Sequence, residues 1–75
     1  MQLKYDPVSD TLYIDTCPPY NEQESDEIAL GVIARSNPDT GEIENLEVFH
    51  FHKRFEQGEA FDIPVRLDMR SARSA

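Results

Sequence analysis

The sequence predicts a mainly β fold with minor α content: a five-stranded, mostly antiparallel meander with at most one short helix. The meander is built from two hairpins plus a C-terminal edge strand. Short runs rich in β-branched and aromatic residues recur between turn signals. Two turns, 6–10 and 37–41, begin alike, with Asp or Asn followed by proline. With 75 residues the chain holds one domain, which we place at 1–69, followed by a flexible tail at 70–75.

The first hairpin is predicted from residues 2–5 and 11–15, which flank the turn at 6–10. Pro7 presets the backbone angle φ of the second turn position. Asp10 is expected in the left-handed region, which Asp and Asn tolerate better than most residues. Residues 16–27 contain two consecutive prolines and then a polar, acidic run. They are predicted to form an exposed connection.

The second hairpin contains the strongest strand pattern in the chain. Residues 28–35 are apolar at alternate positions of both parities, which is typical of a strand covered on both faces. In the turn at 37–41, Gly41 lies where positive φ is required. The apolar positions of the returning strand change parity after Ile43, which predicts a β-bulge at Glu44-Asn45.

The C-terminal third is predicted to end in an edge strand. Residues 53–58 form either a helical turn closed by Gly58 or a loose connection. Apolar residues then alternate with polar ones from Phe61 to Met69. Pro64 removes one ladder donor, and this places the strand at an edge.

A single small sheet leaves its doubly apolar strands without a second layer. The sheet could curl into a half-barrel, or two chains could pack sheet on sheet; we favour the homodimer. The candidate interface residues are Tyr13, Ile33, Phe49 and Phe51. One cysteine, Cys17, excludes an intramolecular disulfide as the stabilising element.

The net charge of −8 restricts the choice of partner. The first 52 residues hold eleven acidic and two basic side chains. This acidity argues against nucleic acid, because phosphate contacts need clustered lysine and arginine. It suits a basic protein partner, although acidity that serves solubility alone is the simpler alternative. No stretch has the apolar length of a signal peptide or of a membrane span, so a cytoplasmic protein without membrane contact is expected.

His50 and His52 are the candidate metal ligands. On a strand, residues i and i+2 project from one face, so two imidazoles there could share a divalent metal. The alternative is a pair of half-exposed histidines at a strand end, and a third reading is pH sensing. Cys17 has no nearby cation in the sequence that would lower its pKa, which favours an ordinary free thiol. No catalytic constellation is visible, so we predict neither an enzyme nor a cofactor.

The two N-terminal hairpins carry a family resemblance. Lys4-Tyr5-Asp6, Asp10 to Ile14, Gly31-Val32-Ile33, Gly41-Glu42-Ile43 and Leu46-Glu47-Val48 follow one another with a distinctive spacing. The chain resembles short bacterial proteins grouped as domain of unknown function 2283. The resemblance implies no catalytic residues. It suggests a companion of a small toxin, and therefore an antitoxin-like or accessory role.

These observations lead to one principal expectation and two alternatives. The principal expectation is a non-enzymatic protein-interaction or regulatory module that acts as a homodimer. The alternatives are an antitoxin-like partner of a small basic toxin, and a small metal- or ligand-binding protein that uses His50 and His52.

Overall fold

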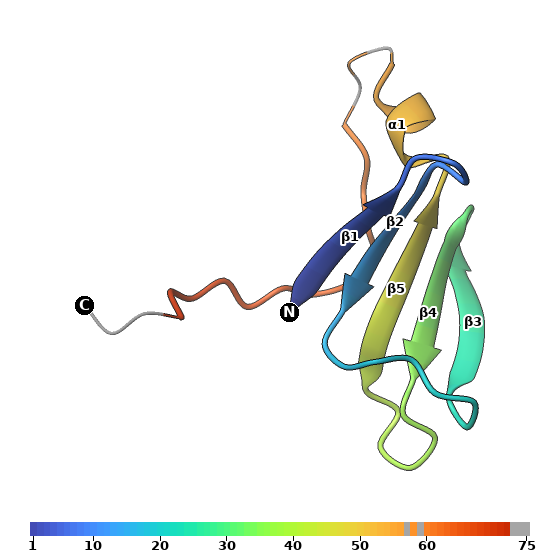
Figure 1. Ribbon diagram of the computed structural model, residues 1–75. Coiled ribbons are helices and arrows are strands. Elements are labelled where there is room, and N and C mark those ends of the chain that lie inside the picture. The colour runs from blue at the N-terminus through green and yellow to red at the C-terminus, as the bar shows by residue number, and fades with distance from the viewer. Residues whose placement is uncertain (57, 59, 73–75) are drawn as a thin grey trace.

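The structure, a computed structural model, describes residues 1–56, 58 and 60–72. Five antiparallel strands form one open sheet, and a single short helix follows them (Figure 1). The elements are β1 (Gln2–Asp6), β2 (Thr11–Asp15), β3 (Glu24–Ala29), β4 (Val32–Ser36), β5 (Ile43–Phe49) and α1 (Phe51–Arg54). The mainly β class with at most one short helix is therefore confirmed.

The strand order β1-β2-β5-β4-β3 shows that the predicted meander order is wrong. The last strand, β5, lies at the centre between β2 and β4, and β3 lies at the far edge. The connection over residues 16–23 therefore crosses the sheet from β2 to β3 (Figure 1). The centre suits β5 because this strand holds three buried residues, Asn45, Leu46 and Val48.

The boundaries of β3 and β4 also differ from the prediction. The expected strand over 28–35 is divided by a turn at Leu30-Gly31, where Gly31 has φ of 71°. Glycine adopts this angle without steric cost, so the chain reverses there. The acidic half of the expected connection becomes β3, because an edge strand keeps charged side chains in water.

The predicted turn geometry is confirmed at both hairpin positions. Asp10 and Gly41 have positive φ, at 53° and 76°. The predicted bulge is present too: Arg35 pairs with Asn45 and Ser36 pairs with Ile43, which leaves Glu44 as the extra residue. The bulge explains how Ile43, with 43% of its surface exposed, and the buried Leu46 belong to one strand.

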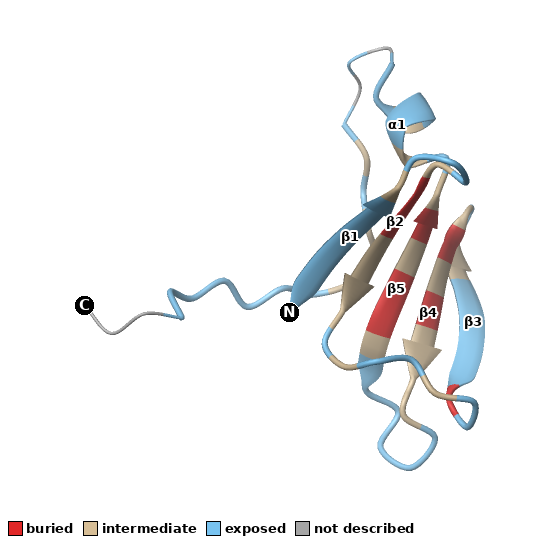
Figure 2. Ribbon diagram, viewed as in Figure 1, coloured by how far each residue is buried: buried red, intermediate tan, exposed pale blue. Residues whose placement is uncertain are grey.

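The core lies on one side of the sheet, which we call the rear face because it points away from the viewer in Figure 1. Its buried residues lie on β2, β4 and β5 (Figure 2), and they are Leu12, Val32, Ala34, Leu46 and Val48. Phe51, Phe61, Ile63 and Val65 pack against them from α1 and the C-terminal segment. Removal of this apolar surface from water stabilises the sheet.

The predicted C-terminal edge strand is wrong. Residues 61–69 form no strand; the segment instead passes behind the sheet and then leaves it beyond β1 (Figure 1). Its alternating pattern has a different cause: Phe61, Ile63 and Val65 face the core, while the residues between them face solvent. Part of the predicted tail, residues 70–72, has no regular structure, and 73–75 lie outside the described residues.

Candidate interaction surface

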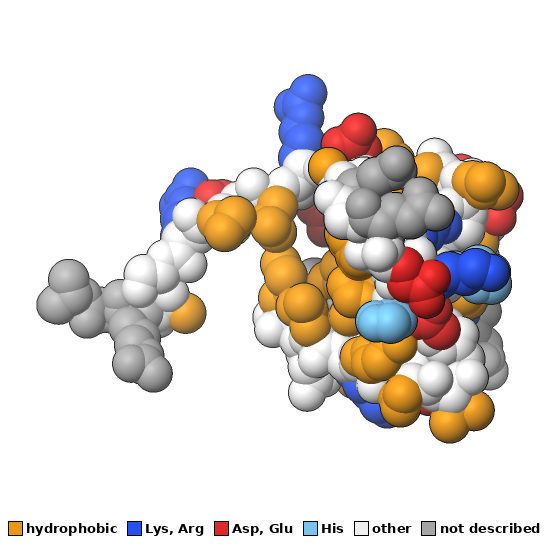
Figure 3. All heavy atoms as spheres, turned by 90° about the horizontal axis from the view of Figure 1, so that it is seen from above, with side chains coloured by type: hydrophobic (Ala, Val, Ile, Leu, Met, Phe, Trp, Pro, Cys, Tyr) orange, Lys and Arg blue, Asp and Glu red, His pale blue; other side chains and the backbone are white. Residues whose placement is uncertain are grey.

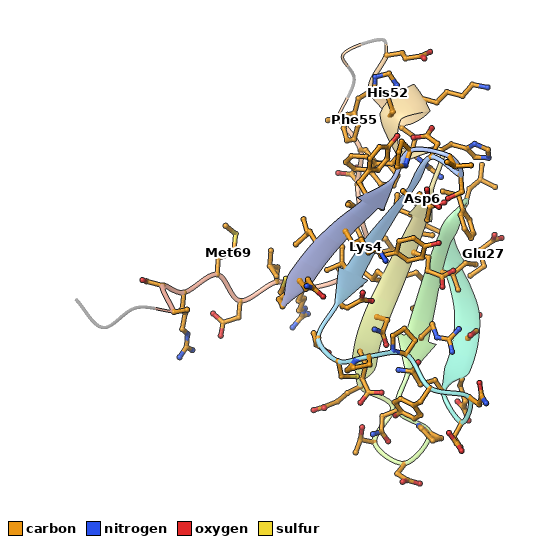
Figure 4. All side chains as sticks on the ribbon, in the orientation of Figure 1. Lys4, Asp6, Glu27, His52, Phe55 and Met69 are labelled. Carbon is orange, nitrogen blue, oxygen red and sulfur yellow. The ribbon has the colours of Figure 1, made fainter. Side chains whose placement is uncertain are left out.

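The face opposite the core, which we call the front face, carries one row of five side chains across all five strands. The strand register aligns Lys4, Tyr13, Glu47, Ile33 and Glu27, in this order from β1 to β3. Lys4 and Glu27 lie at the two edges of the row (Figure 4). Tyr13 and Ile33 are half-buried and flank the half-buried Glu47. The centre of this row is therefore a carboxylate between two largely apolar side chains.

The crossing connection covers the neighbouring part of the front face through a buried network of amides. The side chain of Asn45, 2% exposed, donates to Asp15 Oδ1 at 2.8 Å and to the Cys17 carbonyl at 2.7 Å. Gln23 Nε2 donates to Asn45 Oδ1 at 2.7 Å. Arg35 donates to Gln23 Oε1 at 2.9 Å and to the Tyr20 carbonyl at 3.0 Å. These bonds fasten residues 17–23 to β4 and β5.

The bulge residue Glu44 is tied to the same connection. Its carboxylate accepts hydrogen bonds from the Tyr20 hydroxyl at 2.6 Å and from Gln23 Nε2 at 3.0 Å. These donors favour the charged carboxylate and lower the pKa of Glu44. The same bond raises the pKa of Tyr20 to about 12, because the phenol must keep its proton to donate it.

A second polar cluster joins the first turn to α1. The Asp10 carboxylate accepts bonds from the Tyr5 hydroxyl at 2.6 Å and from the backbone N–H groups of His52 and Lys53 at 2.8 and 3.3 Å. The Tyr5 bond is the largest cause that lowers the pKa of Asp10. Asp10 therefore fixes the start of α1 against the first hairpin.

His50 and His52 do not lie on a strand, so the geometry that would place both imidazoles on one face is absent. His50 has φ of 56° at the N-cap of α1, and His52 lies in the first turn of the helix. Both imidazoles are exposed. Among the described residues, no group of three or more His, Cys, Asp or Glu side chains is placed to hold a metal ion.

The four candidate interface residues divide between the two faces. Tyr13, Ile33 and Phe49 share the front face through the register of β2, β4 and β5. Phe51 instead contacts the aromatic rings of Tyr5 and Phe55, at 6.0 and 5.1 Å between centroids, and packs against the core. The sequence reasoning missed Glu47, although its alternation with Leu46 and Val48 places it opposite the core.

Two further expectations concern Cys17 and membrane-spanning segments. Cys17 is a half-buried free thiol in the crossing connection. The one helix in the described part of the chain is too short to cross a membrane.

Residues 2–51 match the family described as Protein of unknown function (DUF2283). This match covers both hairpins, all five strands and the first residue of α1. No curated protein and no solved structure matches the chain.

Proposed function

Since the chain belongs to the DUF2283 family, whose description assigns no activity, we propose from its surface that it is a non-enzymatic protein-interaction module that acts as a homodimer. The observation that carries the protein-interaction role is the position of Glu47, which lies between Tyr13 and Ile33 on the open front face.

Glu47 has an unused capacity to accept hydrogen bonds. Within the described part of the chain, its carboxylate accepts no hydrogen bond and forms no ion pair. The adjacent strands hold Tyr13 and Ile33 about 5 Å to either side of it. A lysine or arginine from another protein would lay its apolar stem along these two side chains and bring its charge to the carboxylate.

The front face suits a basic partner better than a second copy of itself. Two front faces packed against each other would bring two Glu47 carboxylates together in a partly desolvated interface, which is unfavourable. Glu27 in the same row and Asp6 and Asp15 on the same face add negative charge. A small basic toxin is one partner of this chemistry, which keeps the antitoxin-like role as the second candidate.

The test is capture of the partner by tagged protein from a lysate of the source organism. We expect one dominant basic protein, identified by mass spectrometry and lost as salt rises, because exposed charge pairs are screened. Glu47→Lys should abolish the capture. The matched control is Glu42→Lys, which makes the same charge change at an exposed position in the turn before β5.

Two results would contradict the proposal. One is equal capture by both variants, which would place the contact elsewhere. The other is the absence of any salt-sensitive partner for the wild-type protein.

A further inference from the structure

The edge strand β1 exposes an unusual amount of apolar surface. Met1 is 71% exposed, Leu3 is 62% exposed and Tyr5 is 42% exposed. Leu3 and Tyr5 belong to the rear face, because they pair with Ile14 and Leu12. Natural edge strands usually carry charges or prolines that prevent pairing with another chain. Here the two charged residues of β1, Lys4 and Asp6, both lie on the front face.

The C-terminal segment continues past this same edge. We call residues 66–72 the arm; it leaves the rear of the sheet and projects beyond β1 (Figure 1). Hydrophobic side chains continue along it (Figure 3). Leu67 is 58% exposed, and Met69, at 83% exposed, points into solvent (Figure 4).

The arm continues the alternation of apolar and polar residues that begins at Phe61. Phe61, Ile63 and Val65 cover the rear face of their own sheet. Leu67 and Met69 have the same parity, but Leu67 lies at the β1 edge and Met69 lies beyond it (Figure 4). Leu67 lines a groove of about 930 Å³ together with Met1 and Leu3, at the β1 edge. Leu67 and Met69 would therefore be covered if the rear face continued beyond β1.

We infer that a second copy of the chain supplies this continuation, by antiparallel pairing of β1 with β1 and exchange of the two arms. The inference rests on the proposed homodimer and names its interface. A two-fold axis perpendicular to the sheet keeps the rear face of one copy beside the rear face of the other. The result is a ten-stranded sheet, from 5 strands in each copy, whose middle is covered by the arms.

Side-chain parity, charge and the lack of an N–H on Pro7 restrict the register of the pairing, since a centre at Tyr5 would place Pro7 opposite Leu3. Partners in an antiparallel pair lie on the same face, so a symmetric pairing is centred on one residue of β1. A centre at Lys4 would place two lysines side by side, which is unfavourable. A centre at Leu3 places Leu3 opposite itself, Gln2 opposite Lys4 and Met1 opposite Tyr5. Met69 of each arm then reaches the exposed Tyr5 ring of the other copy, a contact that suits a thioether.

The register is tested by cross-linking. In a Cys17→Ser background, Leu3→Cys should form a covalent dimer under mild oxidation, because directly opposed Cβ atoms are close enough for a disulfide. Lys4→Cys tests the alternative centre. Val8→Cys is the control, since Val8 is 94% exposed in the turn after β1. Rapid cross-linking of the Leu3 variant alone is expected; equal cross-linking of all three would overturn the register.

The interface is tested by analytical ultracentrifugation over a concentration series. Leu3→Lys should weaken dimerisation at least about tenfold, because it places two lysines opposite each other at the axis, and Met69→Lys roughly fivefold. Val8→Lys and Leu30→Lys are the controls, since both replace exposed apolar residues that lie in turns outside β1. Circular dichroism checks that each variant remains folded.

The outcomes separate this inference from the proposed function. A wild-type dimer that Leu3→Lys and Met69→Lys leave intact would overturn the β1 interface and leave the homodimer standing. A wild-type protein that stays monomeric at all concentrations would overturn both. Loss of the dimer in these two variants, with normal capture of the front-face partner, would establish two separate surfaces.

Discussion

Gln23 donates a hydrogen bond from Nε2 to Asn45 Oδ1 at 2.7 Å, and this bond joins the crossing connection to the central strand. Gln23 is 8% exposed and Asn45 is 2% exposed. A buried polar side chain needs such partners, because an unpaired one loses its bonds to water without replacement. The pair therefore holds residues 16–23 across the sheet, in the position that makes β5 central.

Asn45→Ala should destabilise the fold more than a surface change of similar size. The substitution removes three side-chain hydrogen bonds, so the Cys17 carbonyl loses its bond to Asn45 and Gln23 Nε2 keeps only its bond to Glu44. We expect a loss of about 2–3 kcal/mol in the free energy of unfolding. Urea denaturation measures this loss. Glu22→Gln, at an exposed position in the same connection, is the control and should be nearly neutral; a similar loss in both would refute the role of the network.

The Tyr20–Glu44 bond predicts a loss of stability in acid. The folded state lowers the pKa of Glu44, chiefly through the Tyr20 hydroxyl. The resulting stabilisation is present above the unfolded pKa, near 4, and it is lost as the pH falls through the lower folded value. Tyr20→Phe removes the largest cause, so its stability should fall less steeply between about pH 5 and pH 3.

Urea denaturation at a series of pH values measures this slope. Asp6 and Asp10 also have lowered pKa values, so the variant should retain part of the acid dependence. Tyr13→Phe is the matched control, because no hydrogen bond of the Tyr13 hydroxyl to another described residue is present. Identical slopes for Tyr20→Phe and the wild-type protein would show that the bond has no influence in solution.

The sequence predicted the local structure better than the strand order. Turn positions and the bulge follow from nearby residues: Asp10 and Gly41 take positive φ, and the parity change marks Glu44. The order of strands depends on contacts between distant residues, such as Asn45 with Gln23, which no local pattern reveals. On the front face, Tyr13 and Ile33 were found as apolar residues of β2 and β4, whereas Glu47 was missed because a charged residue on a strand ordinarily faces water.

The C-terminal error has a similar origin. Alternation of apolar and polar residues predicts one covered face, and Phe61, Ile63 and Val65 do cover the core. The pattern does not require ladder hydrogen bonds, and this segment covers the core without forming any strand. Covering layers and strands therefore share one sequence signature.

The metal-binding alternative makes a separate prediction about His50 and His52. The wild-type protein should bind Zn²⁺ in a calorimetric titration, and the His50→Ala, His52→Ala double variant should not. Identical weak Zn²⁺ binding by both proteins would refute metal binding by His50 and His52.

Gly31→Ala should weaken the contacts that the Arg54 side chain makes with the β3–β4 turn, the end of β5 and Phe61. The Arg54 guanidinium donates to the Phe49 carbonyl at 2.8 Å and to the Leu30 carbonyl, and it lies 4.4 Å from the centre of the Phe61 ring. A Cβ at Gly31 would collide with this guanidinium. It would also strain the backbone at φ of 71°.

Gly41→Ala separates backbone strain from the collision with Arg54, because Gly41 has φ of 76° but open space where its Cβ would lie. We expect a loss of about 1 kcal/mol for Gly41→Ala from backbone strain alone, and about 2 kcal/mol for Gly31→Ala, since it also disturbs a cation–π contact. Urea denaturation compares them. Hydrogen exchange at Val65, whose N–H donates to the Ile63 carbonyl at 2.8 Å, should accelerate only in Gly31→Ala. Equal losses in the free energy of unfolding, with unchanged exchange at Val65, would contradict this prediction. They would show that Arg54 moves aside without cost and that the C-terminal segment does not depend on its contacts.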